Sequence, residues 1–171
     1  EVTCLDGRTR APGAPFKELS MCGIMGYIGP DSAWDVVIGG LRRLTYRGYD
    51  SAGVVTLHEG KLLLARKVGP LRVLEQAQPQ GLPGQVAIGH TRWATHGGVT
   101  ETNCHPHLDS RERVAIVHNG VIDNVDALRN ELAADGVAFR SETDTEVLAE
   151  LIGRALEAGL SLRDAVIDSL K

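Results

Sequence analysis

Residues 21–29 read MCGIMGYIG, and this short apolar run broken by glycine predicts a β-strand. Asp31 or Ser32 follows as a suitable N-cap, which predicts a helix that extends through Leu44. The apolar positions of this helix recur at helical spacing: Ala33, Val37, Leu41 and Leu44. Regular structure therefore begins near Met21.

The rest of the chain alternates between strand and helix patterns. Residues 54–58 and 62–68 are β-like runs around Glu59-Gly60, which predicts a hairpin. Further strands are predicted at 86–93 and 114–118, with a long polar loop between them, and further helices at 126–134, 143–157 and 162–170. Strands and helices in mixed order predict an α+β layered sandwich.

Length, charge and cysteine content exclude several classes of protein. A chain of 171 residues has the size of one domain and can bury a core without cross-links. A net charge of −4 argues against a nucleic-acid partner or an anionic membrane surface. No apolar run approaches the ~20 residues needed to cross a bilayer. Three distant cysteines without C-x-x-C spacing indicate a reduced, cytoplasmic protein.

Residues 1–20 differ in character from the rest of the chain. They contain two of the seven prolines, no amphipathic period and no apolar stretch long enough for a secretory signal. A flexible leader, a propeptide and a translated upstream region before a start at Met21 all fit this composition. We expect this leader to be disordered and the native domain to occupy residues 21–171.

Cys22 is a candidate nucleophile because it directly follows Met21. If Met21 starts the native chain and is removed, Cys22 carries both a thiol and a free α-amine. An α-amino group titrates near about 7.7–8.0, so it can accept the thiol proton and no histidine base is required. The alternative is that Cys22 is an ordinary buried apolar residue.

Five polar, glycine-flanked blocks follow the order of the predicted strands and helices: residues 22–26 (CGIMG), 46–53 (YRGYDSAG), 90–97 (HTRWATHG), 118–120 (HNG) and 141–146 (SETDTE). Together they resemble the N-terminal glutamine amidotransferase domain of glucosamine-6-phosphate synthases. The resemblance spans Cys22 to Lys171, and its most specific strings are YRGYDSAG and HTRWATHG. It implies an N-terminal-nucleophile αββα sandwich, which we expect to be incomplete at the C-terminus.

The resemblance also implies a role for individual residues. Cys22 matches the nucleophile that attacks the side-chain amide of L-glutamine, and Asn119 and Gly120 match the oxyanion donors. Arg92 matches the residue that binds the substrate α-carboxylate, and Asp144 the residue that binds its α-ammonium. The remaining pocket residues implied are Arg47, Trp93, Thr95 and His96. Neither a cofactor nor a metal is implied.

Taken singly, these residues have simpler interpretations. Arg92 and Asp144 could be surface charges, and Asn119-Gly120 could be a hairpin turn. The histidines between residues 90 and 118, with Cys104 beside them, could form a zinc site, although their spacing is not that of paired zinc ligands. Cys104, where the family has alanine, could be a packing residue or a second reactive thiol.

The resemblance covers only part of the synthases. Their sugar-isomerase-type domains, which bind fructose 6-phosphate, have no counterpart in these 171 residues. We therefore expect at most a glutaminase here. The alternatives are a non-catalytic glutamine-binding module, if the leader keeps the Cys22 nitrogen in a peptide bond, and a related amidotransferase with another acceptor.

Overall fold

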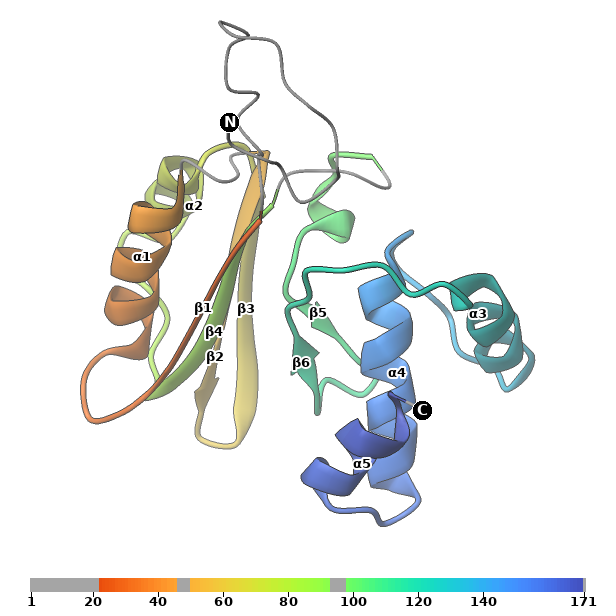
Figure 1. Cartoon of the computed structure of the whole chain (residues 1–171). Helices are drawn as coiled ribbons and strands as arrows, with labels where there is room; N and C mark the ends of the chain where they lie inside the picture. The colour runs from red at the N-terminus through yellow and green to blue at the C-terminus, as the bar shows by residue number, and fades with distance from the viewer. Residues whose placement is uncertain (1–21, 46–49, 93–97, 171) are drawn as a thin grey trace, which may run out of the picture.

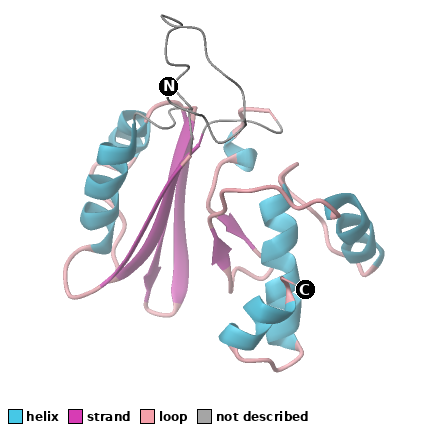
Figure 2. Cartoon of the chain, viewed as in Figure 1, coloured by secondary structure: helices cyan, strands magenta, loops and turns pink. Residues whose placement is uncertain are grey.

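The computed structural model describes residues 22–45, 50–92 and 98–170 and arranges them in layers (Figure 1). Two helices lie on one side of a four-stranded sheet, and a two-stranded sheet lies on its other side. A second set of helices lies beyond the small sheet. Figure 2 shows this alternation of helix, strand, strand and helix across the molecule. The predicted α+β sandwich is confirmed.

The four-stranded sheet is antiparallel throughout. Its order is β1 (Gly23–Ile28), β4 (Val86–Arg92), β2 (Ser51–His58) and β3 (Lys61–Val68). β2 and β3 form the hairpin predicted around Glu59 and Gly60, whose φ values are 48° and 74°. Positive φ at both central residues is the requirement of a type I′ turn, which matches the twist of the paired strands.

The first helix layer consists of α1 (Ala33–Leu44) and α2 (Leu71–Ala77). Ser32 caps α1 by accepting a hydrogen bond from the Asp35 N–H at 3.4 Å, as predicted. The apolar face of α1 packs with strand and α2 side chains into the main core: Ala33, Trp34, Val37, Ile38, Leu41, Ala52, Val54, Ala65, Leu71, Leu74 and Ala87.

The opposite face of the large sheet is covered by three short elements. They are the 3-10 turn η2 (Glu101–Asn103) and the antiparallel pair β5 (His107–Leu108) and β6 (Ala115–Ile116). α4 (Asp144–Glu157) packs on β5 and β6, and α3 (Val125–Ala134) and α5 (Leu162–Asp168) pack against α4. A smaller core joins α4 and α5 to the chain just before β6: Val114, Leu148, Ile152 and Ala165.

Glycines in the central strands let both neighbouring layers approach the large sheet closely. A Cβ placed on Gly53 in β2 would lie 2.1 Å from the backbone oxygen of His105. On the other face, a Cβ on Gly89 in β4 would lie 2.6 Å from Val37 Cγ1 of α1. Gly53 therefore sets the separation of the two sheets, and Gly89 that of α1.

Three histidines fill the space between the two sheets. His90, opposite Gly53 in the strand register, stacks on His105 with ring centroids 4.4 Å apart and planes at 19°. His107 meets His105 edge-on at 4.7 Å. Burial lowers the pKa of His90 to about 4 and that of His107 to about 3, and it also lowers the pKa of His105. This histidine stack is therefore a neutral part of the core near pH 7.

Several predicted boundaries are wrong, and α2 has no counterpart among the predicted helices. The strand predicted at 114–118 is reduced to the two residues of β6, and the predicted long loop contains η2 and β5. Segments this short carry no periodicity that a sequence pattern could reveal. The leader at 1–20 lies outside the described residues. Within them, no helix is long and apolar enough to cross a membrane.

Gly53→Ala is expected to lower the free energy of unfolding by about 1–3 kcal/mol, because the added methyl group collides with the His105 carbonyl. Urea denaturation measures this change. Gly26→Ala in β1 is the matched control, since its Cβ would meet its nearest neighbour at 3.8 Å. Equal stability of the two variants would contradict the close approach of the sheets.

Acid is expected to destabilise the fold through the histidine stack. The unfolded chain binds protons as the pH falls below about 6.5, whereas His90 and His107 stay neutral in the folded state until about pH 4 and pH 3. Each histidine should therefore lower stability by up to about 1.4 kcal/mol per pH unit below pH 6.5. Urea denaturation at pH 7.0 and 5.5 tests this, and equal midpoints would contradict it.

Candidate functional site

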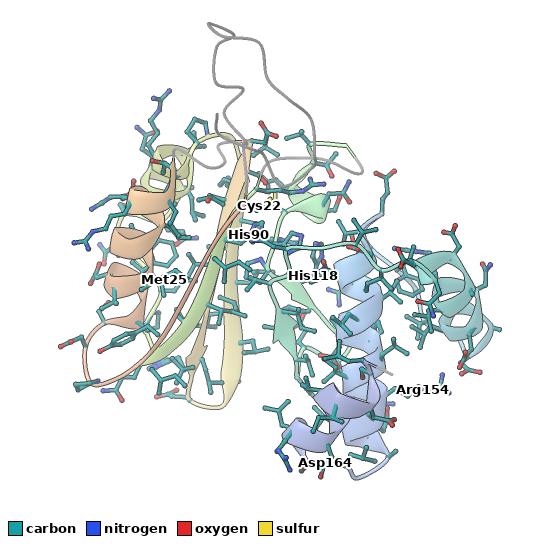
Figure 3. All side chains as sticks on the ribbon, viewed as in Figure 1. Cys22, Met25, His90, His118, Arg154 and Asp164 are labelled. Carbon is teal, nitrogen blue, oxygen red and sulfur yellow. The ribbon has the colours of Figure 1, made fainter. Side chains whose placement is uncertain are left out.

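Cys22 lies directly before β1, at the edge of the large sheet where β4 ends, because Gly23 pairs with Thr91. Cys22 is half-buried, and its backbone carbonyl accepts a hydrogen bond from Asn119 Nδ2 at 3.2 Å. Figure 3 shows Cys22 and His90 together at this end of the space between the layers. The fold thus unites two predicted catalytic residues that are 97 positions apart in sequence.

Asn119 and Gly120 lie in the exposed segment between β6 and α3. They do not join two paired strands, so the hairpin interpretation of this dipeptide is wrong. Asn119 Oδ1 lies 2.9 Å from His90 Nε2. A Cβ on Gly120 would lie 2.6 Å from His118 Nε2, so a larger residue at this position would have to displace the His118 ring.

Asp144 is the first residue of α4 and is half-buried. Its Oδ2 accepts a hydrogen bond from the Ile122 N–H at 3.0 Å, and its Oδ1 accepts one from the Thr145 hydroxyl at 3.3 Å. The Thr145 hydroxyl also lies 3.4 Å from His118 Nδ1. These contacts connect Asp144 to both sides of the Asn119-Gly120 segment.

The start of α4 is not held by the side chain of its N-cap residue. Thr143 is the N-cap, but its side chain makes no capping hydrogen bond. Instead Glu146 accepts hydrogen bonds from the backbone N–H groups of Arg140 and Ser141 at 2.9 and 2.6 Å. The buried Glu146 carboxylate thereby anchors the chain ahead of the helix and fixes the position of Asp144.

Arg92 ends β4 and is buried rather than a surface charge, and its Nη1 donates to the Gly98 carbonyl at 3.3 Å. Asn103 Nδ2 donates to the same carbonyl and to Glu142 Oε2, both at 3.0 Å. The Glu142 N–H donates to Asn103 Oδ1 at 3.0 Å, and the Gly98 N–H to Glu142 Oε2 at 3.3 Å. We call Gly98, Asn103 and Glu142 the latch.

The latch joins the two halves of the site. Gly98 lies six residues after Arg92, and Glu142 lies two residues before Asp144. Hydrogen bonds from Asn103 and the Gly98 N–H lower the pKa of Glu142, which keeps it in the charged form that accepts both. Four other predicted site residues, Arg47, Trp93, Thr95 and His96, lie outside the described residues.

Cys104 is fully buried, and its thiol donates to the Thr100 carbonyl at 3.1 Å. Burial raises the pKa of this thiol, which disfavours the reactive thiolate. In the described ranges, no three His, Cys, Asp or Glu side chains are grouped so as to hold a metal ion. Within the described residues, Cys104 thus packs in the interior with its thiol hydrogen-bonded to the Thr100 carbonyl.

Three residues of the site were not among the predicted ones: His90, Asn103 and Glu142. His90 and Glu142 lie within two of the polar blocks and Asn103 in the long polar loop, and of the three only His90 had a predicted role, as a possible zinc ligand. The period of two in a strand places His90 on the same face as Arg92, so the sequence did carry a signal for it. The latch has no such signal, because its contacts join residues up to 44 positions apart.

The family model of a glutamine amidotransferase domain matches residues 77–162. The glutamine–fructose-6-phosphate aminotransferase (isomerizing) of Streptomyces coelicolor is 54% identical over 148 residues, which cover 85% of this chain and 24% of that protein. The protein of the same name from Pyrococcus horikoshii is 49% identical over 151 residues, 88% of this chain and 25% of its own. The chain spans about a quarter of the length of these curated relatives.

Solved structures share the layered architecture. The glutamine phosphoribosylpyrophosphate amidotransferase from B. subtilis, complexed with ADP and GMP, matches with a TM-score of 0.73 at 32% identity, over 86% of this chain and 32% of its own. A structure described as the allosteric regulatory enzyme of purine biosynthesis matches with a TM-score of 0.75 at 33% identity, with the same coverages. These matches confirm the N-terminal-nucleophile αββα sandwich expected from the sequence.

The family model matches half of the residues of this chain. The chain therefore belongs to the glutamine amidotransferase family, and it corresponds to the amidotransferase domain of proteins of the glutamine–fructose-6-phosphate aminotransferase type.

Proposed function

We propose that this domain hydrolyses L-glutamine to glutamate and ammonia, with Cys22 as the nucleophile. The observation that carries the proposal is the contact between Asn119 Nδ2 and the Cys22 carbonyl, since it places an amide donor beside the thiol residue. Membership of the amidotransferase family supports the reaction type.

The reaction proceeds in two balanced steps. The Cys22 thiol loses its proton to its own α-amine, which is available once Cys22 is the first residue, and Sγ attacks the side-chain carbonyl carbon of glutamine. The carbon–nitrogen bond then breaks, the proton leaves with the nitrogen as ammonia, and a γ-glutamyl thioester remains. Water attacks this thioester, which releases glutamate and restores the thiol.

Asn119 and Gly120 stabilise the negative charge that develops on the substrate oxygen in both steps. The Asn119 amide and the Gly120 N–H are the two donors, and loss of one such donor typically costs about 10²–10³ in rate. Both residues are exposed and lie at the Cys22 end of the molecule, where a substrate side chain can reach them.

The two charged ends of the amino acid are bound by residues from different layers. The Arg92 guanidinium, at the end of β4, binds the α-carboxylate, and Asp144, at the start of α4, binds the α-ammonium. Arg47, Trp93, Thr95 and His96 complete the pocket. The latch sets the distance between Arg92 and Asp144, because it connects the segments that carry them.

In the longer protein, the ammonia passes to fructose 6-phosphate to give glucosamine 6-phosphate in the cytoplasm. The names of the curated relatives support this acceptor. The acceptor-binding domains would lie in the three quarters of those proteins that this chain does not match. No cofactor, nucleic acid or membrane takes part.

A glutamine-binding module without turnover is the second candidate, because 21 residues precede Cys22 in the printed sequence. A peptide bond at the Cys22 nitrogen removes the base, whereas the binding residues remain. The intact mass of the purified protein identifies its first residue and thus distinguishes the two functions. Turnover is expected only from protein that starts at Cys22.

Cys22→Ala is expected to abolish ammonia release from glutamine, measured with a coupled ammonia assay on protein that starts at residue 22. In the unsubstituted protein, a glutamine analogue with an electrophilic side chain should modify Cys22 and leave the buried Cys104 intact, as peptide mass mapping would show. Cys104→Ala is the control and should retain activity. Labelling of Cys104 in place of Cys22 would refute the mechanism.

Asn103→Ala is expected to raise the KM for glutamine about tenfold with a smaller change in kcat, because the latch no longer holds the Arg92 and Asp144 segments together. Thr102→Ala, at the exposed neighbouring position of η2, should leave both constants unchanged. Steady-state kinetics measures the effect, with thermal unfolding to show that both variants fold. An unchanged KM in folded Asn103→Ala would contradict the role of the latch.

A further inference from the structure

Three segments of the chain meet in one short line of polar contacts at the site. His90 comes from β4, Asn119 from the segment after β6, and Cys22 from the residue before β1. His90 Nε2 lies 2.9 Å from Asn119 Oδ1, and Asn119 Nδ2 lies 3.2 Å from the Cys22 carbonyl oxygen. Figure 3 shows Cys22 and His90 close to each other at this end of the sheet.

The direction of every hydrogen bond in this line is determined by its last member. A backbone carbonyl only accepts hydrogen bonds, so the end of the Asn119 amide that faces Cys22 must be Nδ2. The opposite end is then Oδ1, which also only accepts. His90 must therefore donate from Nε2, which makes it the Nε2–H tautomer.

The surroundings of His90 independently favour the same tautomer. Among the described residues, His90 Nδ1 is buried without a hydrogen-bond partner, so a proton on that nitrogen would be an unsatisfied donor. The ring is 1% exposed and stacks on His105 at 4.4 Å, which prevents it from turning. Burial also lowers the pKa of His90 to about 4, so the ring is neutral and carries a single N–H near pH 7.

We propose that His90 is a positioning residue for catalysis: its Nε2–H holds the Asn119 amide in the one orientation that presents Nδ2 to the reacting centre. This inference rests on the proposed glutaminase function. One N–H of Nδ2 binds the Cys22 carbonyl, and the second is directed to the developing oxyanion. A half-turn of the amide would place Oδ1 there instead, and two oxygens would then repel each other.

A positioning role predicts a specific kinetic pattern. The oxyanion exists only during reaction, so a misoriented Asn119 should lower kcat and leave the KM for glutamine nearly unchanged. If His90 had only a structural role, its substitution would loosen the packing between the two sheets. Substitution of any other member of the histidine stack would then have the same effect.

Three variants in protein that starts at Cys22 separate these possibilities. His90→Leu removes the donor and is expected to lower kcat about 10²-fold with KM within about threefold of the starting value. His90→Gln keeps an N–H near the position of Nε2 and should recover much of this loss. His107→Leu, elsewhere in the stack with its Nε2 on the Thr143 hydroxyl, is the matched control and should keep kcat within about threefold.

Equal kcat losses in His90→Leu and His107→Leu, at equal thermal stability, would overturn the positioning role.

A second measurement does not depend on turnover. Nitrogen-15 NMR of the imidazole should show His90 as the neutral Nε2–H tautomer, and the Asn119→Leu variant should shift that signal. An Nδ1–H tautomer, or a signal indifferent to Asn119, would overturn the proposal even if the enzyme is active. Absence of glutamine hydrolysis in the unsubstituted protein would refute the proposed function instead, while the NMR result would still decide the orientation of Asn119.

Discussion

The antiparallel register of β1 against β4 is the constraint on which the rest of the site depends. With Gly23 opposite Thr91, the residue that precedes β1 must lie beside the last residues of β4. The same register directs His90 toward the small sheet and Thr91 toward α1. A slip by one residue would exchange these faces and bury Arg92 under the helix. The thiol, the histidine and the guanidinium are thus placed by a single pairing.

The space between the two sheets is polar, which is unusual for the interior of a sandwich. His90, His105, His107 and Asn103 are buried there, and a buried polar group is destabilising unless it finds a partner. His107 meets the Thr143 hydroxyl, His105 Nδ1 accepts from the His118 N–H, and His90 binds Asn119. These pairings tolerate only one relative placement of the layers, so the interlayer contacts that stabilise the fold also align the site.

Local signals in the sequence were sufficient for the elements that local physics determines. The cap of α1 at Asp31 or Ser32, the Glu59-Gly60 turn and the amphipathic face of α1 were all predicted correctly, because each depends on neighbours within a few positions. β5 and β6 could not be predicted, since two-residue strands exist only through contacts with distant segments. The site shows the same division: its residue types were recognised as motifs, whereas the line from His90 to Asn119 and the latch appear only once the layers are assembled.

The proposed function assigns binding and catalysis to different contacts across the same gap. In it, Arg92 from the large sheet and Asp144 from α4 bind the two ends of the substrate, and the latch connects the segments that carry them. Asn119, the proposed oxyanion donor, instead contacts the His90 ring, which belongs to the large sheet. A change in the latch should therefore alter affinity for glutamine, and a change at His90 the rate of the chemical step. This separation follows from the geometry, because the latch is built from Gly98, Asn103 and Glu142, and the other line from His90, Asn119 and the Cys22 carbonyl.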